Sequence, residues 1–327
     1  MSIWGNLSSA ILNELDKKWE SNSDVQISTS GSTGNPKKIN FEKSLMQWSA
    51  EQTLKHCIKS KNLKQLIAIP IDKAGGLMQW ARAKTWKTEF DFIEPSSNPL
   101  LNYPGNAAIT SLTPMQLAVI LDCQRSRQVL KQFETILIGG GELIKDIELK
   151  AMEVAPKIHW IHTFGMTETY SHFAFRTFGD DLFKLIDQTE ISMSESGLMI
   201  KNPCTKMQWL QTNDIVNIID NNTFMWEGRI DFTINSGGIK IQLELIEKMI
   251  QKELNWPVNS FFCWWKSDKI LGQKLIVCSL SENPIPQNWN FLPRYHKPKE
   301  IIIIHKIFFS STGKQLRQKS FGSFNEK

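Results

Sequence analysis

The chain has 327 residues, of which 41% are hydrophobic and 22% are charged, a balance typical of a globular protein with one large and one smaller domain. The N-terminus lacks a basic region followed by an apolar stretch, and no apolar run is long enough to cross a bilayer, so neither export nor membrane insertion is expected. The formal charge of +5 comes from 38 basic and 33 acidic residues without a dense basic block. A nucleic-acid partner is therefore not expected.

The cysteines predict neither a disulfide framework nor a zinc site. They are five in number, scattered, and never spaced as CxxC. A reducing, cytoplasmic location fits this usage. The five are Cys57, Cys123, Cys204, Cys263 and Cys278.

The first part of the chain alternates predicted helices and strands. Apolar residues at helical spacing predict a helix within the first twenty residues. Predicted strands follow at 25–28, 66–71, 109–112, 135–138 and 158–161, and predicted helices at 42–59 and 114–123, with a glycine turn at Gly75-Gly76 before a further helix. Strands alternating with helices predict a parallel sheet covered by helices, and hence an α/β domain.

The second part of the chain has a different texture. Beyond Glu190, short strands and turns predict a smaller antiparallel sheet. A helix is predicted at 241–254, and strands at 261–265, 274–280 and 301–304. We therefore expect a domain at 1–228, a hinge at 229–232 and a compact C-terminal α+β domain at 233–327.

A loop of small residues connects the first predicted strand to the next helix. It runs from Thr29 to Lys37 as Thr-Ser-Gly-Ser-Thr-Gly-Asn-Pro-Lys. Backbone N–H groups in such a loop approach phosphate oxygens closely, while hydroxyls and a lysine add donors and charge. The spacing does not match the GxxxxGK[ST] motif of P-loop NTPases. Taken alone, the loop is as consistent with a surface turn as with a phosphate site.

Further segments, in order along the chain, make this loop more specific. They are Gly139-Gly-Gly-Glu142, Phe164-Gly-Met-Thr-Glu-Thr169, Thr212-Asn-Asp214, the segment from Gly228 to Glu247, and Ser311-Thr-Gly-Lys-Gln-Leu-Arg317. With the loop, this series resembles the motifs of the adenylate-forming superfamily, which contains acyl-CoA synthetases, luciferases and the adenylation domains of peptide synthetases. The resemblance implies a large N-terminal domain of helix-covered β-sheets and a small mobile C-terminal α+β domain. Because the loop begins at residue 29, we expect this chain to lack the front subdomain that usually precedes it.

The resemblance implies an ATP site and a CoA channel. The phosphates would be held by Thr29, Ser30, Gly31, Ser32, Thr33, Gly34 and Lys37. The adenine would be held by Gly139, Gly140, Gly141, Phe164 and Gly165. Asp214 would accept hydrogen bonds from the ribose hydroxyls, with Arg229 assisting. Gly237 and Gly238 would line the pantetheine channel, although a strand-to-strand turn explains them equally well.

The resemblance also implies the residues that carry the chemistry. Activating an acid pushes one anion onto the α-phosphate of another, so the site needs positive charge. Lys314 would bridge the two anions as the catalytic lysine, Thr167 would contact phosphate, and Glu168 would hold Mg²⁺. Asp231 matches the hinge about which the C-terminal domain would rotate before CoA attacks.

In its compact length and in residues 69–82 and 167–172, the chain resembles the o-succinylbenzoate:CoA ligases of menaquinone biosynthesis. That acid carries two carboxylates, so a cation or strong donor must face the second one. Arg82, Lys73 and His172 are the candidates. A ligase for another aryl or fatty acid and a non-catalytic nucleotide-binding module stay open as alternatives. The expected partners are a small carboxylic acid, ATP and CoA, and a homodimer is compatible with the sequence.

Overall fold

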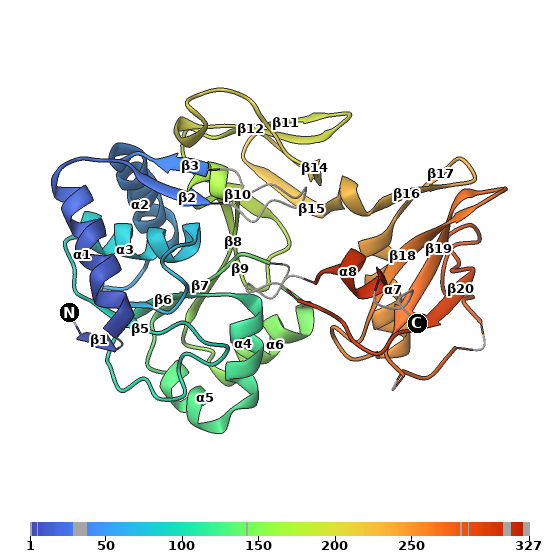
Figure 1. Ribbon diagram of the computed structural model, residues 1–327, viewed down its shortest axis with the longest axis horizontal. Coiled ribbons are helices and arrows are strands. Elements are labelled where there is room, and N and C mark those ends of the chain that lie inside the picture. Colours follow the sequence, from blue (N-terminus) through green and yellow to red (C-terminus); the bar gives the residue numbers. More distant parts are fainter. Residues whose placement is uncertain are drawn as a thin grey trace. The chain divides into compact units, whose positions relative to one another are not determined.

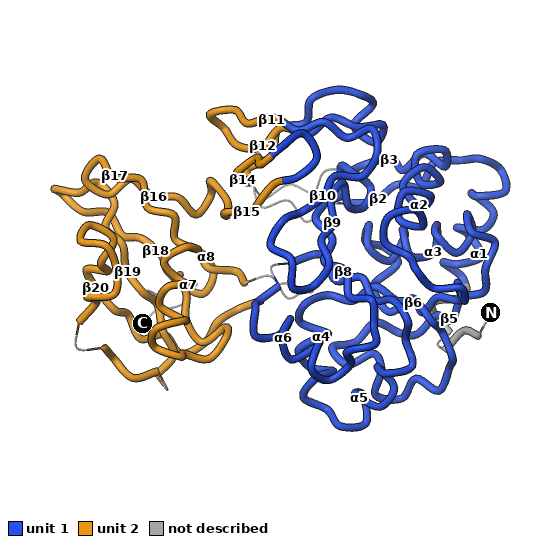
Figure 2. The backbone as a smooth tube through the Cα atoms, turned by 180° about the vertical axis from the view of Figure 1, so that it is seen from behind, with its two compact units in different colours: residues 1–191, 200–210, 220–223 blue, residues 192–199, 211–219, 224–327 orange. Residues whose placement is uncertain are grey.

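The computed structural model describes the chain except residues 1, 5, 29–37, 142, 282, 287, 310–314 and 323–327. It consists of two compact units, coloured in Figure 2. The first takes in residues 1–191, 200–210 and 220–223, and the second residues 192–199, 211–219 and 224–327. The domain boundaries expected at 228 and 232 stay predictions.

The first unit is built on a mostly parallel sheet with the strand order β1-β5-β4-β6-β7-β8-β9-β10. Pairing is parallel from β1 to β8 and antiparallel from β8 to β10. The strands are β1 (Ser2–Trp4), β4 (Gln65–Ile67), β5 (Phe90–Ile93), β6 (Ile109–Leu112), β7 (Thr135–Ile138), β8 (His159–Gly165), β9 (His172–Thr177) and β10 (Phe183–Leu185). The carboxyl ends of neighbouring parallel strands therefore meet at one edge, where ligands of such sheets bind.

Helices cover both faces of this sheet (Figure 1). One face packs against α1 (Asn6–Glu20), α2 (Lys43–Cys57) and α3 (Ala74–Trp86), and the other against α4 (Pro114–Asp122), α5 (Gln124–Leu130) and α6 (Lys145–Val154). Successive side chains of β4 point to opposite faces of the sheet. Leu66 packs in the core with α4 and Ile67 in the core with α3, and both are fully buried. Within the described residues, no helix combines the length and apolarity needed to cross a membrane.

Two local predictions in this unit are wrong. The strand expected at 66–71 ends at Ile67, and Gly75-Gly76 lie inside the first turn of α3 rather than in a turn before it. The chain reverses earlier, where the Lys73 N–H donates to the Pro70 carbonyl at 3.1 Å. The Leu77 N–H then donates to the Lys73 carbonyl at 2.9 Å, which opens the helix. Proline has no backbone N–H to donate to a neighbouring strand, so the strand stops before Pro70.

Smaller elements complete the chain around this sheet. Strand β2 (Val25–Ser28) pairs antiparallel with β3 (Lys38–Phe41), so Ser28 and Lys38 flank the predicted phosphate loop. A three-stranded sheet has the order β11-β12-β13, with β11 at Glu190–Ser194, β12 at Gly197–Lys201 and β13 at Leu210–Gln211. Short 3-10 turns lie at η1 (Thr167–Thr169) and η2 (Pro203–Thr205).

The second unit contains the antiparallel pair β14 (Asp214–Ile218) and β15 (Thr223–Arg229), followed by η3 (Ile230–Phe232). Its main sheet has the order β17-β16-β19-β18, and β20 pairs with β19 in parallel. Its elements are β16 (Thr233–Ser236), β17 (Ile239–Gln242), α7 (Leu243–Leu254), β18 (Phe261–Asp268), β19 (Gly272–Ser279), β20 (Glu300–Ile303) and α8 (Arg317–Gly322). Both sheet faces are covered, because Val277 packs with α7 and the adjacent Ile276 with Ile302.

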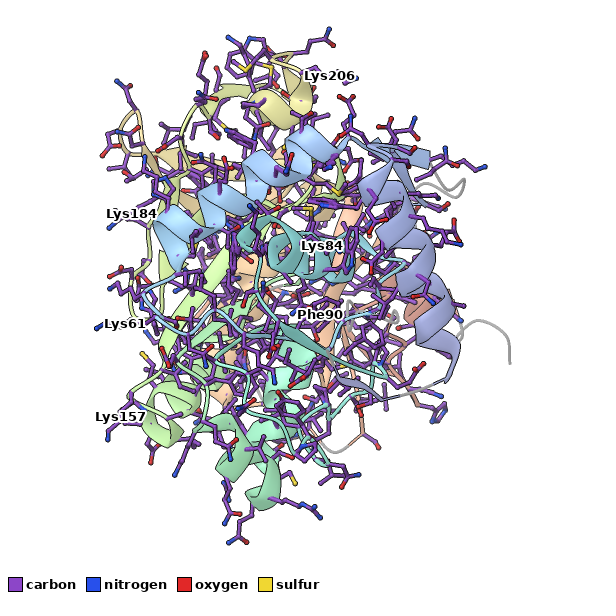
Figure 3. All side chains as sticks on the ribbon, turned by 90° about the vertical axis from the view of Figure 1, so that its left-hand side faces the viewer. Lys61, Lys84, Phe90, Lys157, Lys184 and Lys206 are labelled. Carbon is purple, nitrogen blue, oxygen red and sulfur yellow. The ribbon has the colours of Figure 1, made fainter. Side chains whose placement is uncertain are left out.

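Four exposed lysines of the first unit are spread out rather than gathered. Figure 3 labels several exposed lysines, which lie apart from one another along its outside. They are Lys61, Lys157, Lys184 and Lys206. One of them, Lys206, is neutralised by Glu42 at 2.6 Å.

Candidate active site

The turn after β8 carries the predicted metal and phosphate residues. At Gly165 the backbones of β8 and β9 approach so closely that a side chain would collide with the Ser171 carbonyl, so only glycine fits. The Thr169 hydroxyl closes the turn, because it accepts from the Met166 N–H at 3.1 Å and donates to the Ser171 carbonyl at 2.8 Å. Thr167 and Glu168 are therefore presented by a fixed turn at the carboxyl edge of the sheet.

The Glu168 side chain suits a bound Mg²⁺. It is half-buried, and no lysine, arginine or histidine of the described residues forms an ion pair with it. The described part of the chain also contains no cluster of three or more acidic, histidine or cysteine ligands. One carboxylate is enough for Mg²⁺, which keeps several waters and takes its other ligands from phosphates.

The predicted adenine residues sit on two neighbouring strand ends. Gly139, Gly140 and Gly141 follow β7 directly, and the Thr163 hydroxyl of β8 donates to the Ile138 carbonyl at 3.0 Å. The Phe164 ring lies edge-on to Phe173, with 5.4 Å between ring centroids, and is half-buried. Because β7 and β8 are adjacent, the glycine run and Phe164 belong to one edge of the sheet.

A buried arginine packs against the same sheet. Arg82 of α3 is only 4% exposed. Its Nη2 donates to the Ser171 hydroxyl at 2.6 Å and its Nη1 to the Ser111 hydroxyl of β6 at 3.3 Å, whereas its Nε has no partner. Within the described residues it forms no ion pair. Burial lowers its pKa to about 10, so it stays charged at neutral pH.

His172 lies beside this arginine and is fully buried. Its Nδ1 is 3.2 Å from the Ser171 hydroxyl and its Nε2 is 3.7 Å from the Cys57 sulfur. Burial, reinforced by the nearby charges of Arg82 and His56, lowers the pKa of His172 to about 3. The imidazole is therefore neutral, so His172 supplies a hydrogen bond but no charge.

Two of the three substrate candidates are thus brought together. Arg82 and His172 meet through Ser171, while Lys73 pairs with Asp72 at 3.2 Å and keeps 39% of its side chain exposed. Sequence reasoning missed the hydroxyl groups of Ser111 and Ser171. Ser171 directly follows the Thr-Glu-Thr-Tyr segment, but nothing in the spacing marks Ser111, which only the pairing of strands brings near Arg82.

The predicted ribose and hinge residues form a second cluster, in the second unit. Asp214 accepts from the Trp226 indole at 3.2 Å and lies 3.6 Å from the Arg229 guanidinium. Arg229 also pairs with Asp231 at 2.7 Å, and Asn213 donates to that carboxylate at 2.5 Å. On balance, the carboxylates around Arg229 raise its pKa against the opposing effect of burial. The ribose and hinge candidates therefore share one arginine.

The remaining predictions can be placed only in part. Gly237 and Gly238 form the two-residue turn between β16 and β17, with φ of 62° and 84°, which glycine adopts without strain. Their role toward CoA stays a prediction. The phosphate-loop residues 29–37 and Lys314 lie outside the described residues, so their roles also stay predictions.

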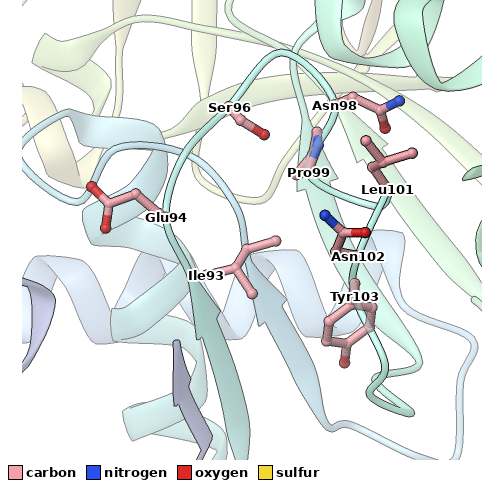
Figure 4. A pocket seen from close by; sticks show the side chains of 8 residues that line it. All are labelled: Ile93, Glu94, Ser96, Asn98, Pro99, Leu101, Asn102 and Tyr103. Atoms are coloured by element: carbon pink, nitrogen blue, oxygen red, sulfur yellow. The ribbon is translucent and has the colours of Figure 1, made fainter. Parts of the chain in front are cut away.

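A cavity of about 330 Å³ opens beside the loop after β5 (Figure 4). It is lined by Ile93, Glu94, Ser96, Asn98, Pro99, Leu101, Asn102 and Tyr103. Tyr103 is fixed there by its hydroxyl, which donates to Asp91 at 2.7 Å. None of the predicted site residues lines this cavity, so it is separate from the cluster around Arg82.

Comparison with known proteins identifies the chain. No family model matches it. A crystal structure of an acyl-CoA synthetase (AMP-forming)/AMP-acid ligase II-like protein from Dyadobacter fermentans is 30% identical, with a TM-score of 0.62, and the match covers 95% of this chain and 92% of that one. The chain belongs to the AMP-forming acyl-CoA synthetases.

Other relatives of this acyl-CoA synthetase carry a more specific name. The 2-succinylbenzoate–CoA ligase of Listeria monocytogenes is 25% identical, over 94% of this chain and 71% of its own length. The o-succinylbenzoate CoA synthetase of Bacillus subtilis, in complex with the acyl-adenylate OSB-AMP, has a TM-score of 0.75 at 19% identity and matches 90% of this chain and 68% of that one. A second structure of that enzyme holds ATP and a magnesium ion. The predicted fold class, superfamily and ligase class are confirmed.

Proposed function

We propose that this AMP-forming acyl-CoA synthetase converts 2-succinylbenzoate to its CoA thioester, through an acyl-adenylate, in the cytoplasmic synthesis of menaquinone. The observation that carries the proposal is the buried Arg82, which has two hydroxyl partners and no carboxylate among the described residues. Relatives named 2-succinylbenzoate–CoA ligase support the same acid.

A buried charge without a counter-ion is costly, so Arg82 calls for an anionic ligand. The unused hydrogens of its two terminal nitrogens can serve a planar carboxylate, which matches the fork of a guanidinium. The acid that is activated needs one carboxylate at the α-phosphate. A second carboxylate on the same molecule would occupy Arg82, as a dicarboxylic acid such as 2-succinylbenzoate requires.

ATP would lie along the carboxyl edge of the sheet. Thr167 would contact phosphate, and Phe164 with Gly139–Gly141 would hold the adenine. Glu168 would hold Mg²⁺, which supplies charge neutralisation between the acid and the triphosphate. Asp214, already oriented by the Trp226 indole, would accept hydrogen bonds from the ribose.

Transfer to CoA would follow a change at the hinge. Lys314 would neutralise charge in the adenylating arrangement, and rotation about Asp231 would then admit the thiol. In the structure Asp231 is held by Arg229 and Asn213, so this rotation would exchange hydrogen bonds at those two side chains. The Gly237-Gly238 turn would lie along the pantetheine of CoA.

Two alternatives predict different results. A ligase for another aryl or fatty acid would keep its activity when Arg82 is replaced by an apolar residue. A non-catalytic nucleotide-binding module would bind ATP without turnover. Pyrophosphate release across a panel of mono- and dicarboxylic acids, with and without CoA, separates the three. We expect 2-succinylbenzoate to give AMP and a CoA thioester, with monoacids at least tenfold poorer in kcat/KM. Equal turnover of mono- and diacids would contradict the proposal.

A further inference from the structure

The hydroxyl of Ser171 connects Arg82 to a buried pair of side chains that the reaction itself does not use. These are His172 of β9 and Cys57 at the end of α2, and both are buried. With Ser171 and Arg82 they form a hydrogen-bonded series. The Cys57 sulfur lies 3.7 Å from Nε2 of His172, Nδ1 of His172 lies 3.2 Å from the Ser171 hydroxyl, and that hydroxyl lies 2.6 Å from Nη2 of Arg82. Ser171 itself is half-buried, whereas the other three residues are buried.

The protonation states of Cys57 and His172 follow from their burial. Burial raises the pKa of the Cys57 thiol to about 12 and lowers that of His172 to about 3, so the thiol keeps its proton and the imidazole carries one. Sulfur is a weak acceptor, whereas an imidazole nitrogen is a good one. When the thiol of Cys57 donates to Nε2 of His172, the ring proton resides on Nδ1.

That tautomer determines what Ser171 can do. A hydroxyl has two acceptor lone pairs and one proton. Its lone pairs receive Nη2–H of Arg82 and Nδ1–H of His172, so its own proton must point to a third partner. Ser111 also accepts from Arg82 and is half-buried. Two hydroxyl protons and the unused N–H groups of Arg82 can then surround one anion.

We propose that Cys57 and His172 are positioning residues that lock Ser171 as a hydrogen-bond donor to the second carboxylate of the acid. The inference rests on the proposed function and deepens it. It explains why a neutral histidine, and not a second cation, lies beside Arg82. With Ser171 free to rotate, its hydroxyl could present a lone pair to the carboxylate, which repels it.

The test compares Cys57→Ala with Cys57→Ser, which restores a donor to Nε2. A hydrogen bond to a charged group is worth on the order of tenfold in affinity. We expect Cys57→Ala to raise KM for 2-succinylbenzoate about tenfold with kcat nearly unchanged, and Cys57→Ser to stay near the parent. KM for the monoacid that keeps the activated carboxylate and lacks the second one should not change. Cys278→Ala, which removes a buried thiol from the core of the second unit, is the matched control.

A second measurement reads the tautomer directly. Nitrogen-15 NMR of histidine-labelled protein, with His172→Gln to assign the signal, should show the His172 proton on Nδ1 in the parent. A proton on Nε2 would overturn the inference. So would a diacid-selective parent whose Cys57→Ala variant keeps the parental KM. If the parent does not prefer the diacid, the proposed function fails instead, while the NMR result still decides the tautomer.

Discussion

The carboxylate of Glu148 accepts hydrogen bonds from both terminal nitrogens of Arg176, at 2.9 and 2.8 Å, and neither side chain is more than 9% exposed. The pair joins α6 to β9, the strand that begins at His172. The Gly179 N–H also donates to Glu148, at 2.6 Å. Breaking a buried pair leaves an uncompensated charge, so we expect Glu148→Gln to lower the free energy of unfolding by about 3–5 kcal/mol, measured by urea denaturation.

Glu190→Gln is the control for this variant. Its carboxylate also pairs with a cation, Lys201 at 3.0 Å, but is 55% exposed. Surface pairs contribute about 0–1 kcal/mol, so this variant should unfold almost as the parent does. Equal losses in the two variants would contradict the special role of the Glu148–Arg176 pair.

Stability should also fall in acid through Glu148. Burial alone would raise the pKa of this carboxyl, but the hydrogen bonds from Arg176 and Gly179 and the charge of Arg176 lower it on balance, below its ordinary 4.5. A carboxyl with a lowered pKa stabilises the fold fully above its ordinary pKa, and that stability is lost as pH falls through the lowered value. We expect the acid limb of the stability profile to flatten in Glu148→Gln. An unchanged limb would assign acid unfolding to other groups.

Lys314→Ala should stop adenylation while ATP still binds. The ammonium would act only as charge develops between the acid and the α-phosphate, so its loss should lower the adenylation rate at least 100-fold. Pyrophosphate exchange measures adenylation, and isothermal titration measures ATP binding. Thioester formation from pre-formed acyl-adenylate should change much less. Adenylation at the parental rate would remove Lys314 from the reaction.

Glu168→Gln should shift the magnesium requirement. An amide oxygen is a poorer ligand for Mg²⁺ than a carboxylate oxygen, so the concentration of Mg²⁺ that gives half-maximal adenylation should rise about tenfold or more. Glu153→Gln, a substitution on the surface helix α6, is the control. If the variant shows the parental magnesium curve, Glu168 does not hold the metal.

The sequence predicted those parts of the fold that follow from local pattern. Alternation of buried strands with helices identified β6, β7 and α4 nearly to the residue, because their apolar runs end at turn or cap residues such as Thr113. The strand at β4 was predicted too long because Ile69 and Ile71 are buried without being paired in the sheet. A run of apolar residues in a sequence shows that the segment is buried, but it does not show whether the segment pairs with a neighbouring strand.

The candidate site divides in the same way. Motif residues such as Glu168 and Asp214 could be named from the order of the motifs alone. The partners of Arg82 and His172 could not, because Ser111, Ser171 and Cys57 come from three separate parts of the chain that only the fold brings together. Nor could the neutrality of His172, which follows from its burial beside a guanidinium.

The account depends most on Arg82 as the recognition site for a second carboxylate. The most direct measurement is kcat/KM of Arg82→Met, relative to the parent, for 2-succinylbenzoate and for the two monoacids that each lack one of its carboxylates. Loss of a charge-assisted hydrogen bond to a carboxylate predicts a fall of roughly 100-fold for the diacid and less than threefold for the better monoacid. Equal losses for diacid and monoacid would contradict the assignment of Arg82.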